Sequence, residues 1–154
     1  MSTITRPRFA VSFMLAALLA ASATTGCQAK FKKAEGGEVD QAQKASAEKF
    51  ATDTLTAWAK NTYPKVTIAA DPKFKEAQDD ETKQKAADKS IEGSMGDFQS
   101  LTYYETQKSD PPDMVLHRFK GKFSKSEAPA EVRVVFDKSG NLAGFWIKPW
   151  KDSL

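Results

Sequence analysis

Residues 101–148 alternate between apolar and polar side chains, and this period of two restricts the last third of the chain to half-buried β-strands. In the clearest stretch, Val115, His117, Phe119, Gly121 and Phe123 alternate with Arg118, Lys120 and Lys122. Turn-forming residues separate the stretches, and residues 137–141 have the composition of a short hairpin loop. The pattern therefore predicts four strands in an antiparallel meander, the last stopped by Pro149 because proline cannot extend the ladder.

The region before these strands has helical spacing instead. Between residues 40 and 63, apolar residues recur every three or four positions, at Ala47, Phe50, Ala51, Leu55, Trp58 and Ala59. This spacing predicts one amphipathic helix. Pro64 should close it, because the residue before a proline is pushed out of the helical region.

A second helical region should begin at Asp71-Pro72, where the aspartate can accept from free helix amides and the proline suits the first helical position. The acidic cluster at 79–81 predicts an interruption, and Gly93 or Gly96 should end the region. Helices packed on one face of a meander give a layered α+β fold. We expect it to form a single domain over residues 39–154.

The N-terminus has the layout of an export signal. Arg6 and Arg8 precede a run of low polarity over residues 9–21, which at about 13 residues is shorter than the roughly 20 that a membrane-spanning helix needs. The small residues Thr24-Thr25-Gly26 then lead directly to Cys27, the single cysteine of the chain. This segment resembles the lipobox of bacterial lipoproteins, although Thr24 stands where that family most often has leucine.

The resemblance implies that residues 1–26 are a signal peptide removed before Cys27, that this cysteine carries the lipid, and that the lipid anchors the chain in a bacterial membrane. If the host has two membranes, we expect the outer one, facing the periplasm, because Gln28 is not the aspartate that resembles an inner-membrane retention signal. The composition of residues 27–38 predicts a flexible tether. The alternative is an ordinary secretory signal, with Cys27 as a leftover thiol or a small buried residue.

Charge and cysteine content limit the remaining function classes. The chain has 23 basic and 20 acidic residues, and removal of Arg6 and Arg8 with the signal leaves 21 basic residues against the same 20 acidic ones. A nearly balanced chain with interleaved charges has no field to attract phosphate backbones, so we expect no nucleic-acid partner. One cysteine allows no disulfide within the chain, and the fold must depend on packing alone.

No residue pattern predicts catalysis. His117 is the one histidine, and its alternation with Val115 and Phe119 places it on an apolar face, where a hydrogen-bonded core histidine is commoner than an acid or base. Ligand contact is the other alternative for this residue. A single histidine, and a Cys27 taken up by lipid, leave no ligand set for a metal, and no phosphate-binding loop is present. We therefore expect neither a catalytic site nor a cofactor.

Aromatic residues are concentrated in the strand region and supply the remaining signal. Most of them should be core, but if the apolar side chains of 132–136 face the helix, then Leu142, Gly144 and Trp146 fall on the opposite face from Phe145 and Ile147. An exposed aromatic surface on a tethered domain is a plausible contact site. The binding residues predicted on this basis are Tyr103, His117, Phe119 and Trp146.

The order of elements, the start of the strand region at Leu101, and the residues of 132–149 resemble small bacterial envelope domains with nuclear-transport-factor-like or cystatin-like cone folds. Such domains bind small apolar ligands or protein partners, and a few are enzymes, so the fold does not choose the function. We expect a noncatalytic, membrane-anchored envelope lipoprotein that binds a small apolar ligand or a protein partner. The alternatives are a structural or assembly accessory of the envelope and an isomerase- or hydrolase-like enzyme.

Overall fold

The computed structural model describes residues 30–109 and 113–151, so the lipobox and Cys27 lie outside the described part. In chain order its elements are β1 (Phe31–Lys33), the short 3-10 helix η1 (Gly36–Glu38), α1 (Gln41–Trp58), α2 (Pro72–Gln78), α3 (Glu81–Met95), β2 (Phe98–Ser109), β3 (Val115–Phe123), β4 (Ala130–Phe136) and β5 (Leu142–Pro149). The strands form one antiparallel sheet in the order β1-β2-β3-β4-β5. The α+β class is confirmed, but the sheet has five strands and the sequence predicted four.

Helix α1 begins where the sequence predicted and ends earlier. Asp40 caps its first turn by accepting from the amide of Gln43 at 3.0 Å. The chain leaves the helix after Trp58, because Asn61 adopts a left-handed backbone with φ of 55° and Thr62 turns its amide back to the carbonyl of Ala57. The interval before Pro64 is therefore a turn that ends α1, and the predicted extension of the helix to residue 63 is wrong.

The second helical region is divided as the sequence predicted. Asp71 caps α2, and Pro72 is its first residue. Asp80 caps α3 only two residues after α2 ends, so the acidic cluster separates the two helices. Gly96, with φ of 83°, ends α3. Among the described helices, none combines the length and the apolar composition needed to cross a membrane.

The fifth strand is β1, which lies inside the segment predicted to be a flexible tether. Lys32 pairs with Lys108 and Lys33 with Gln107, and the amide of Ala34 donates to the carbonyl of Thr106. The prediction of a tether reaching residue 38 is therefore wrong. β1 is too short to show an alternation, and it forms because the long strand β2 offers free backbone groups along its edge.

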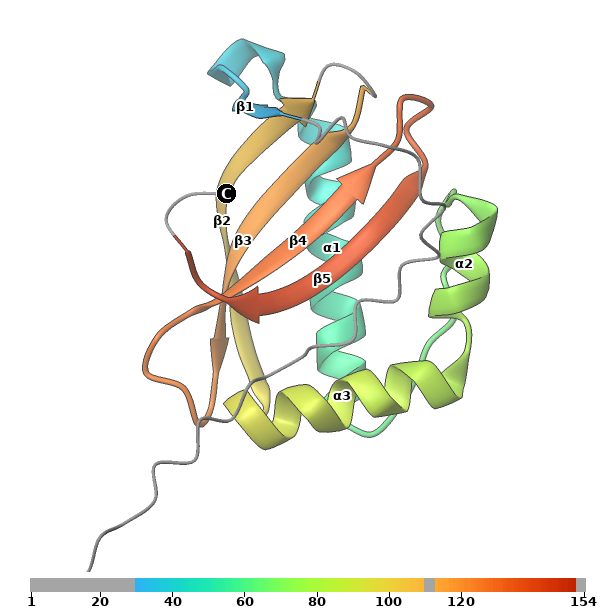
Figure 1. The fold of residues 1–154 in the computed structure, drawn as a ribbon, viewed down its shortest axis with the longest axis vertical. Helices are drawn as coiled ribbons and strands as arrows, with labels where there is room; N and C mark the ends of the chain where they lie inside the picture. Colours follow the sequence, from blue (N-terminus) through green and yellow to red (C-terminus); the bar gives the residue numbers. More distant parts are fainter. Residues whose placement is uncertain (1–29, 110–112, 152–154) are drawn as a thin grey trace, which may run out of the picture.

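Helix α1 lies across one face of the sheet, which we call the inner face, and the opposite side is the outer face (Figure 1). The core between α1 and the sheet is closed by α2, α3 and the segment at 63–70, and its fully buried members include Ala47, Ala51, Leu55, Phe119, Val132, Val134 and Leu142. Polar contacts tie the helices together, since the indole of Trp58 donates to Gln84 at 2.9 Å. Helix α1 covers the inner face only, although Leu116 and Val135 at the centre of the outer face are buried as well.

A bulge near the start of β5 changes which residues reach the core. Val135 pairs with Gly144, and the next residue of β4, Phe136, pairs with Leu142. One step along β4 therefore corresponds to two steps along β5, which is a β-bulge. Leu142 therefore points to the inner face and is fully buried, while Trp146 points to the outer face. The expectation that Leu142 shares a face with Trp146 is wrong, because a strict alternation cannot anticipate a bulge.

Candidate binding surface

His117 belongs to a chain of hydrogen bonds on the inner face. The hydroxyl of Tyr103 lies 2.9 Å from Thr106 Oγ1, which lies 2.8 Å from His117 Nδ1. The other ring nitrogen, Nε2, lies 3.1 Å from Gln43 Oε1 on α1. An amide oxygen can only accept, so Nε2 donates to Gln43, whereas the threonine hydroxyl at Nδ1 can donate or accept. Both nitrogens of the imidazole are therefore hydrogen-bonded.

The surroundings of His117 favour a structural role. Its side chain has no exposed surface, and its ring packs edge-on against Phe136 at a centroid distance of 5.8 Å. Burial lowers the pKa of His117 to about 4, with Lys44 acting in the same direction and Asp40 against it. A general acid or base must reach a substrate, and this ring is enclosed by the residues it holds together.

The four predicted binding residues do not form one surface. Tyr103 and Phe119 pair across β2 and β3 on the inner face, where Phe119 is fully buried and Tyr103 is partly covered by Lys44 at 4.6 Å from its ring. Trp146 pairs with Arg133 and lies on the outer face. The predicted grouping of Tyr103, Phe119 and Trp146 around one sheet surface is therefore wrong, because cross-strand pairs put them on opposite sides of the sheet.

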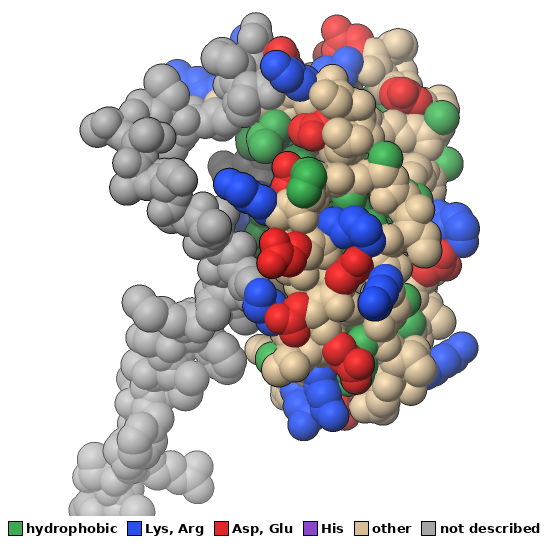
Figure 2. All heavy atoms as spheres, turned by 90° about the vertical axis from the view of Figure 1, so that its right-hand side faces the viewer, with side chains coloured by type: hydrophobic (Ala, Val, Ile, Leu, Met, Phe, Trp, Pro, Cys, Tyr) green, Lys and Arg blue, Asp and Glu red, His purple; other side chains and the backbone are tan. Residues whose placement is uncertain are grey.

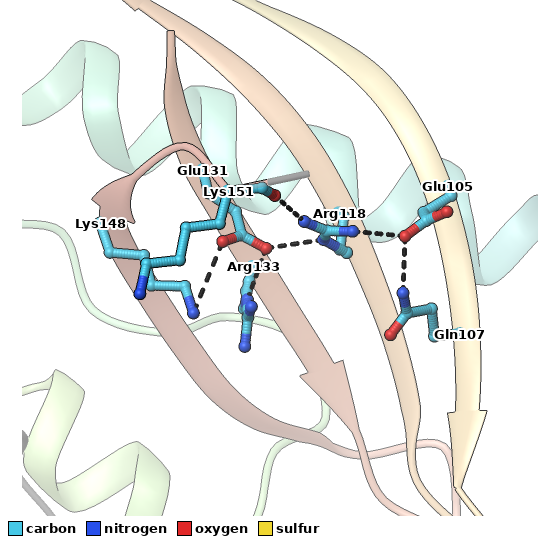
Figure 3. A network of polar contacts seen from close by, with 7 residues as sticks. All are labelled: Glu105, Gln107, Arg118, Glu131, Arg133, Lys148 and Lys151. Carbon is cyan, nitrogen blue, oxygen red and sulfur yellow. Dashed lines mark hydrogen bonds and ion pairs between the residues drawn. The ribbon is translucent and has the colours of Figure 1, made fainter. Parts of the chain in front are cut away.

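The outer face instead carries a network of charged groups that the sequence did not predict (Figure 3). Arg118 is at its centre, with 1 % of its side chain exposed. Its Nη1 donates to Glu105 on β2, its Nε donates to Glu131 on β4 at 2.6 Å, and its Nη2 donates to the carbonyl of Lys151 at 2.8 Å. The guanidinium thus joins three segments of the chain across the sheet.

Glu131 collects the other cations of the network. Its Oε1 also accepts from the Nε of Arg133 at 2.7 Å, and its Oε2 lies 3.5 Å from the ammonium of Lys148. Burial alone would raise the pKa of Glu131, but the hydrogen bonds from Arg133 and Arg118 hold it below its ordinary value. Glu131 is therefore a fully buried carboxylate shared by three basic side chains.

The alternation places these charged residues at the polar positions of the strands and predicts no contact between them. The available signal was that acidic and basic residues recur at outward-facing positions of neighbouring strands, as Arg118 on β3 and Arg133 and Glu131 on β4 do. Register decides which of them meet, and the bulge between Tyr103 and Glu105 brings that carboxylate opposite Arg118. Alternation within one strand does not show which residues of two strands pair.

Exposed aromatic rings lie beside this network. Trp146 and Tyr104 are 38 % and 39 % exposed, and both are on the outer side of the sheet. The ring of Trp146 lies over the backbone of Gly144, so that a Cβ added there would be 2.0 Å from the ring. Tyr104 packs edge-on against Trp150 at 4.7 Å, and Arg118 and Lys120 lie over both of these rings at 4.6 to 5.3 Å.

A small crevice is present near the C-terminal end of α1. It lies between Leu55, Trp58, Asp88, Phe98 and Phe123 and has a volume of about 10 Å³, which is room for about one water molecule. The hydroxyl of Tyr63 donates to Asp88 at 3.1 Å, and burial raises the pKa of that carboxyl. The described residues contain no cluster of His, Cys, Asp or Glu able to hold a metal ion.

Comparison with models of protein families, with curated proteins and with solved structures finds no significant match to this chain.

Proposed function

We propose that this chain is a noncatalytic lipoprotein of the bacterial envelope, held to a membrane by lipid on Cys27, that binds its partner with the outer face of the sheet. The observation that carries the proposal is the exposure of Trp146 and Tyr104 beside a rigid charged network, on the side of the sheet opposite α1. Exposed aromatic residues among fixed polar groups are typical of contact surfaces.

The packing of the inner face disfavours both catalysis and the binding of a small apolar ligand there. His117 and Phe119 are fully buried, and both histidine nitrogens already have partners. A small apolar ligand could reach these residues only by displacing α1, which contributes Gln43 to the same hydrogen-bond chain. The isomerase- or hydrolase-like alternative is disfavoured for the same reason, because its acid or base would have to act from within a packed core.

We also propose that the domain has a cone fold of the kind its sequence resembles. The order of strands β1 to β5 follows the chain, and α1 lies across the inner face between the two ends of the sheet (Figure 1). These features support the resemblance to cystatin-like or nuclear-transport-factor-like envelope domains.

The binding surface is tested by photo-crosslinking in intact cells of the host. A photoreactive phenylalanine analogue replaces Trp146 in the full chain, and the same analogue at Lys89, an exposed position on α3, is the matched control. We expect crosslinked species from position 146 and not from position 89. Equal yields from the two positions would contradict a binding role for the outer face.

The lipid anchor is tested separately by the mass of the N-terminal peptide of the mature protein. We expect that peptide to begin at Cys27 with acyl chains on the thiol and on the new amino group, and Cys27→Ser to abolish acylation and leave the signal uncut. An unmodified Cys27 in the mature chain would overturn the anchor and leave the outer face untouched as a binding surface.

A further inference from the structure

The strand positions on the outer face carry a large excess of positive charge. Residues paired across strands share a face, so the register assigns each outward-pointing side chain. Six of these side chains are basic, and they are Lys33, Arg118, Lys120, Lys122, Arg133 and Lys148. The acidic ones are two, Glu105 and Glu131. By contrast, acidic and basic side chains are intermixed over the side of the molecule formed by α2 and α3 (Figure 2).

The two carboxylates do not neutralise this surface. Arg118 engages both of them, and Arg133 shares the Oε1 atom of Glu131 with it. Burial lowers the pKa of Lys148, and the charge of Arg133 lowers it further. The Nη2 atom of Arg133 is buried without a hydrogen-bond acceptor among the described residues. The Oε2 atom of Glu131 is likewise buried without a hydrogen-bond donor among the described residues. The excess of positive charge on this face therefore lies in its exposed lysines, Lys33 and Lys122, together with the half-buried Lys120.

The aromatic residues on this face suit a lipid headgroup layer. Tryptophan and tyrosine are enriched where a membrane meets water, because each has an apolar ring and a polar edge. Trp146 and Tyr104 are the exposed large hydrophobic side chains of the described chain, and both lie among the basic residues of the outer face. Basic groups with interspersed aromatic rings bind anionic bilayers through both charge and partial insertion.

The position of β1 brings this face near the membrane. If Cys27 carries the lipid, as proposed above, the four steps from Cys27 to Phe31 span at most about 14 Å. β1 is a strand of the same sheet, and neighbouring strands lie about 4.8 Å apart, so Arg133 on β4 is only about 14 Å from β1. A long tether would allow any orientation, whereas this short connection keeps the sheet beside the bilayer.

We propose that the outer face of the sheet lies on the negatively charged phospholipid headgroups of the membrane that holds Cys27. This proposal rests on the lipid anchor and names the partner of the binding surface. Lys33, Lys120 and Lys122 approach headgroup phosphates, Trp146 and Tyr104 enter the interface, and the buried network keeps the surface rigid. Helix α1, which lies on the opposite side of the sheet, faces away from the bilayer (Figure 1).

The test uses the mature lipidated protein in vesicles of phosphatidylcholine, with or without about 30 % phosphatidylglycerol. Because the thiol of Cys27 is occupied by lipid, a cysteine introduced at Tyr104 is the single site for a nitroxide label, and one at Lys89 is the control position. With phosphatidylglycerol present, we expect the label at 104 to become protected from a water-soluble relaxation agent while the label at 89 stays accessible. Salt at about 0.5 M should reduce that protection, because it screens charges beyond a few Å.

A charge-removing variant and its matched control test whether the lysines of the outer face drive docking. Each lysine near an anionic surface changes the docking equilibrium about fivefold, so Lys33→Gln, Lys120→Gln and Lys122→Gln together should weaken docking about a hundredfold. The same number of changes at the exposed positions Lys60, Lys85 and Lys89 should leave it unchanged, with the label at 104 as the readout in both variants. Thermal unfolding of both variants shows whether each is folded.

The outcomes separate this proposal from the one on which it rests. Equal accessibility of the label at 104 in both kinds of vesicle, with the protein still anchored, would overturn membrane docking and leave the lipoprotein assignment intact. Crosslinking of position 146 to a protein and not to lipid would also overturn it, while supporting the outer face as a binding surface. A mature chain with an unmodified Cys27 would remove the anchor itself.

Discussion

Acidification should destabilise the fold through the burial of His117. The ordinary pKa of histidine is 6.5, and burial lowers the pKa of His117 to about 4 in the folded chain. Between these values the unfolded chain binds a proton that the folded chain does not, so stability falls as the pH falls through this window. The effect is absent above pH 6.5 and complete below about pH 4. A difference of about 2.5 pKa units corresponds to about 3 kcal/mol.

Denaturant unfolding of the wild-type protein at intervals from pH 7.5 to 4.5 measures this loss, and His117→Gln is the comparison. Glutamine does not titrate and still offers a donor and an acceptor to Gln43 and Thr106, the two partners of the ring. We expect the wild type to lose about 2 to 3 kcal/mol more than the variant over this range. The chain has one histidine, so no other imidazole contributes to the difference.

The carboxylates are common to both proteins and so cancel in this comparison, including Asp88, whose pKa is raised by burial. Hydrogen bonds lower the pKa values of Asp79, Asp80 and Asp137, so the stabilisation from these groups is present above the ordinary aspartate pKa of 3.8 and is lost only at lower pH. Both proteins carry them equally. If the wild type and His117→Gln lose stability in parallel between pH 7.5 and 4.5, His117 titrates near its ordinary value and the argument from burial is wrong.

Three further changes test the outer face and α3 by their effect on the free energy of unfolding. Glu131→Gln should cost about 3 to 5 kcal/mol, because it leaves buried guanidinium groups without their shared carboxylate. The control Glu127→Gln, in an exposed loop, should change stability by less than about 0.5 kcal/mol. Similar values for the two variants would contradict the network. Gly144→Ala should cost about 1 to 3 kcal/mol, because the new Cβ meets the ring of Trp146, and a second change of Trp146→Ala should remove most of that penalty. Gly93→Ala should stabilise α3 by about 0.5 to 1 kcal/mol, because the added Cβ meets nothing within 4 Å. An unfolding temperature no higher than that of the wild type would show that this position is not regular helix.

The sequence by itself determined the elements whose causes are local. The alternation in 115–123 and 132–136 specifies strands because side chains of a strand point to opposite faces in turn. The interruption at 79–81 follows from the preference of aspartate for helix ends, and Asp80 does cap α3. Each of these decisions is made within a few residues, so it can be read from a short stretch of chain.

Tertiary structure alone decided the elements that depend on a partner strand. Phe31–Lys33 is a strand only because β2 has a free edge beside it, and Leu142 enters the core only because a bulge offsets β5 against β4. The charged network required Glu105, Arg118 and Glu131 to meet across three strands, which no single strand specifies. Pairing register is a property of two distant segments at once, and it also separated Tyr103 and Phe119 from Trp146.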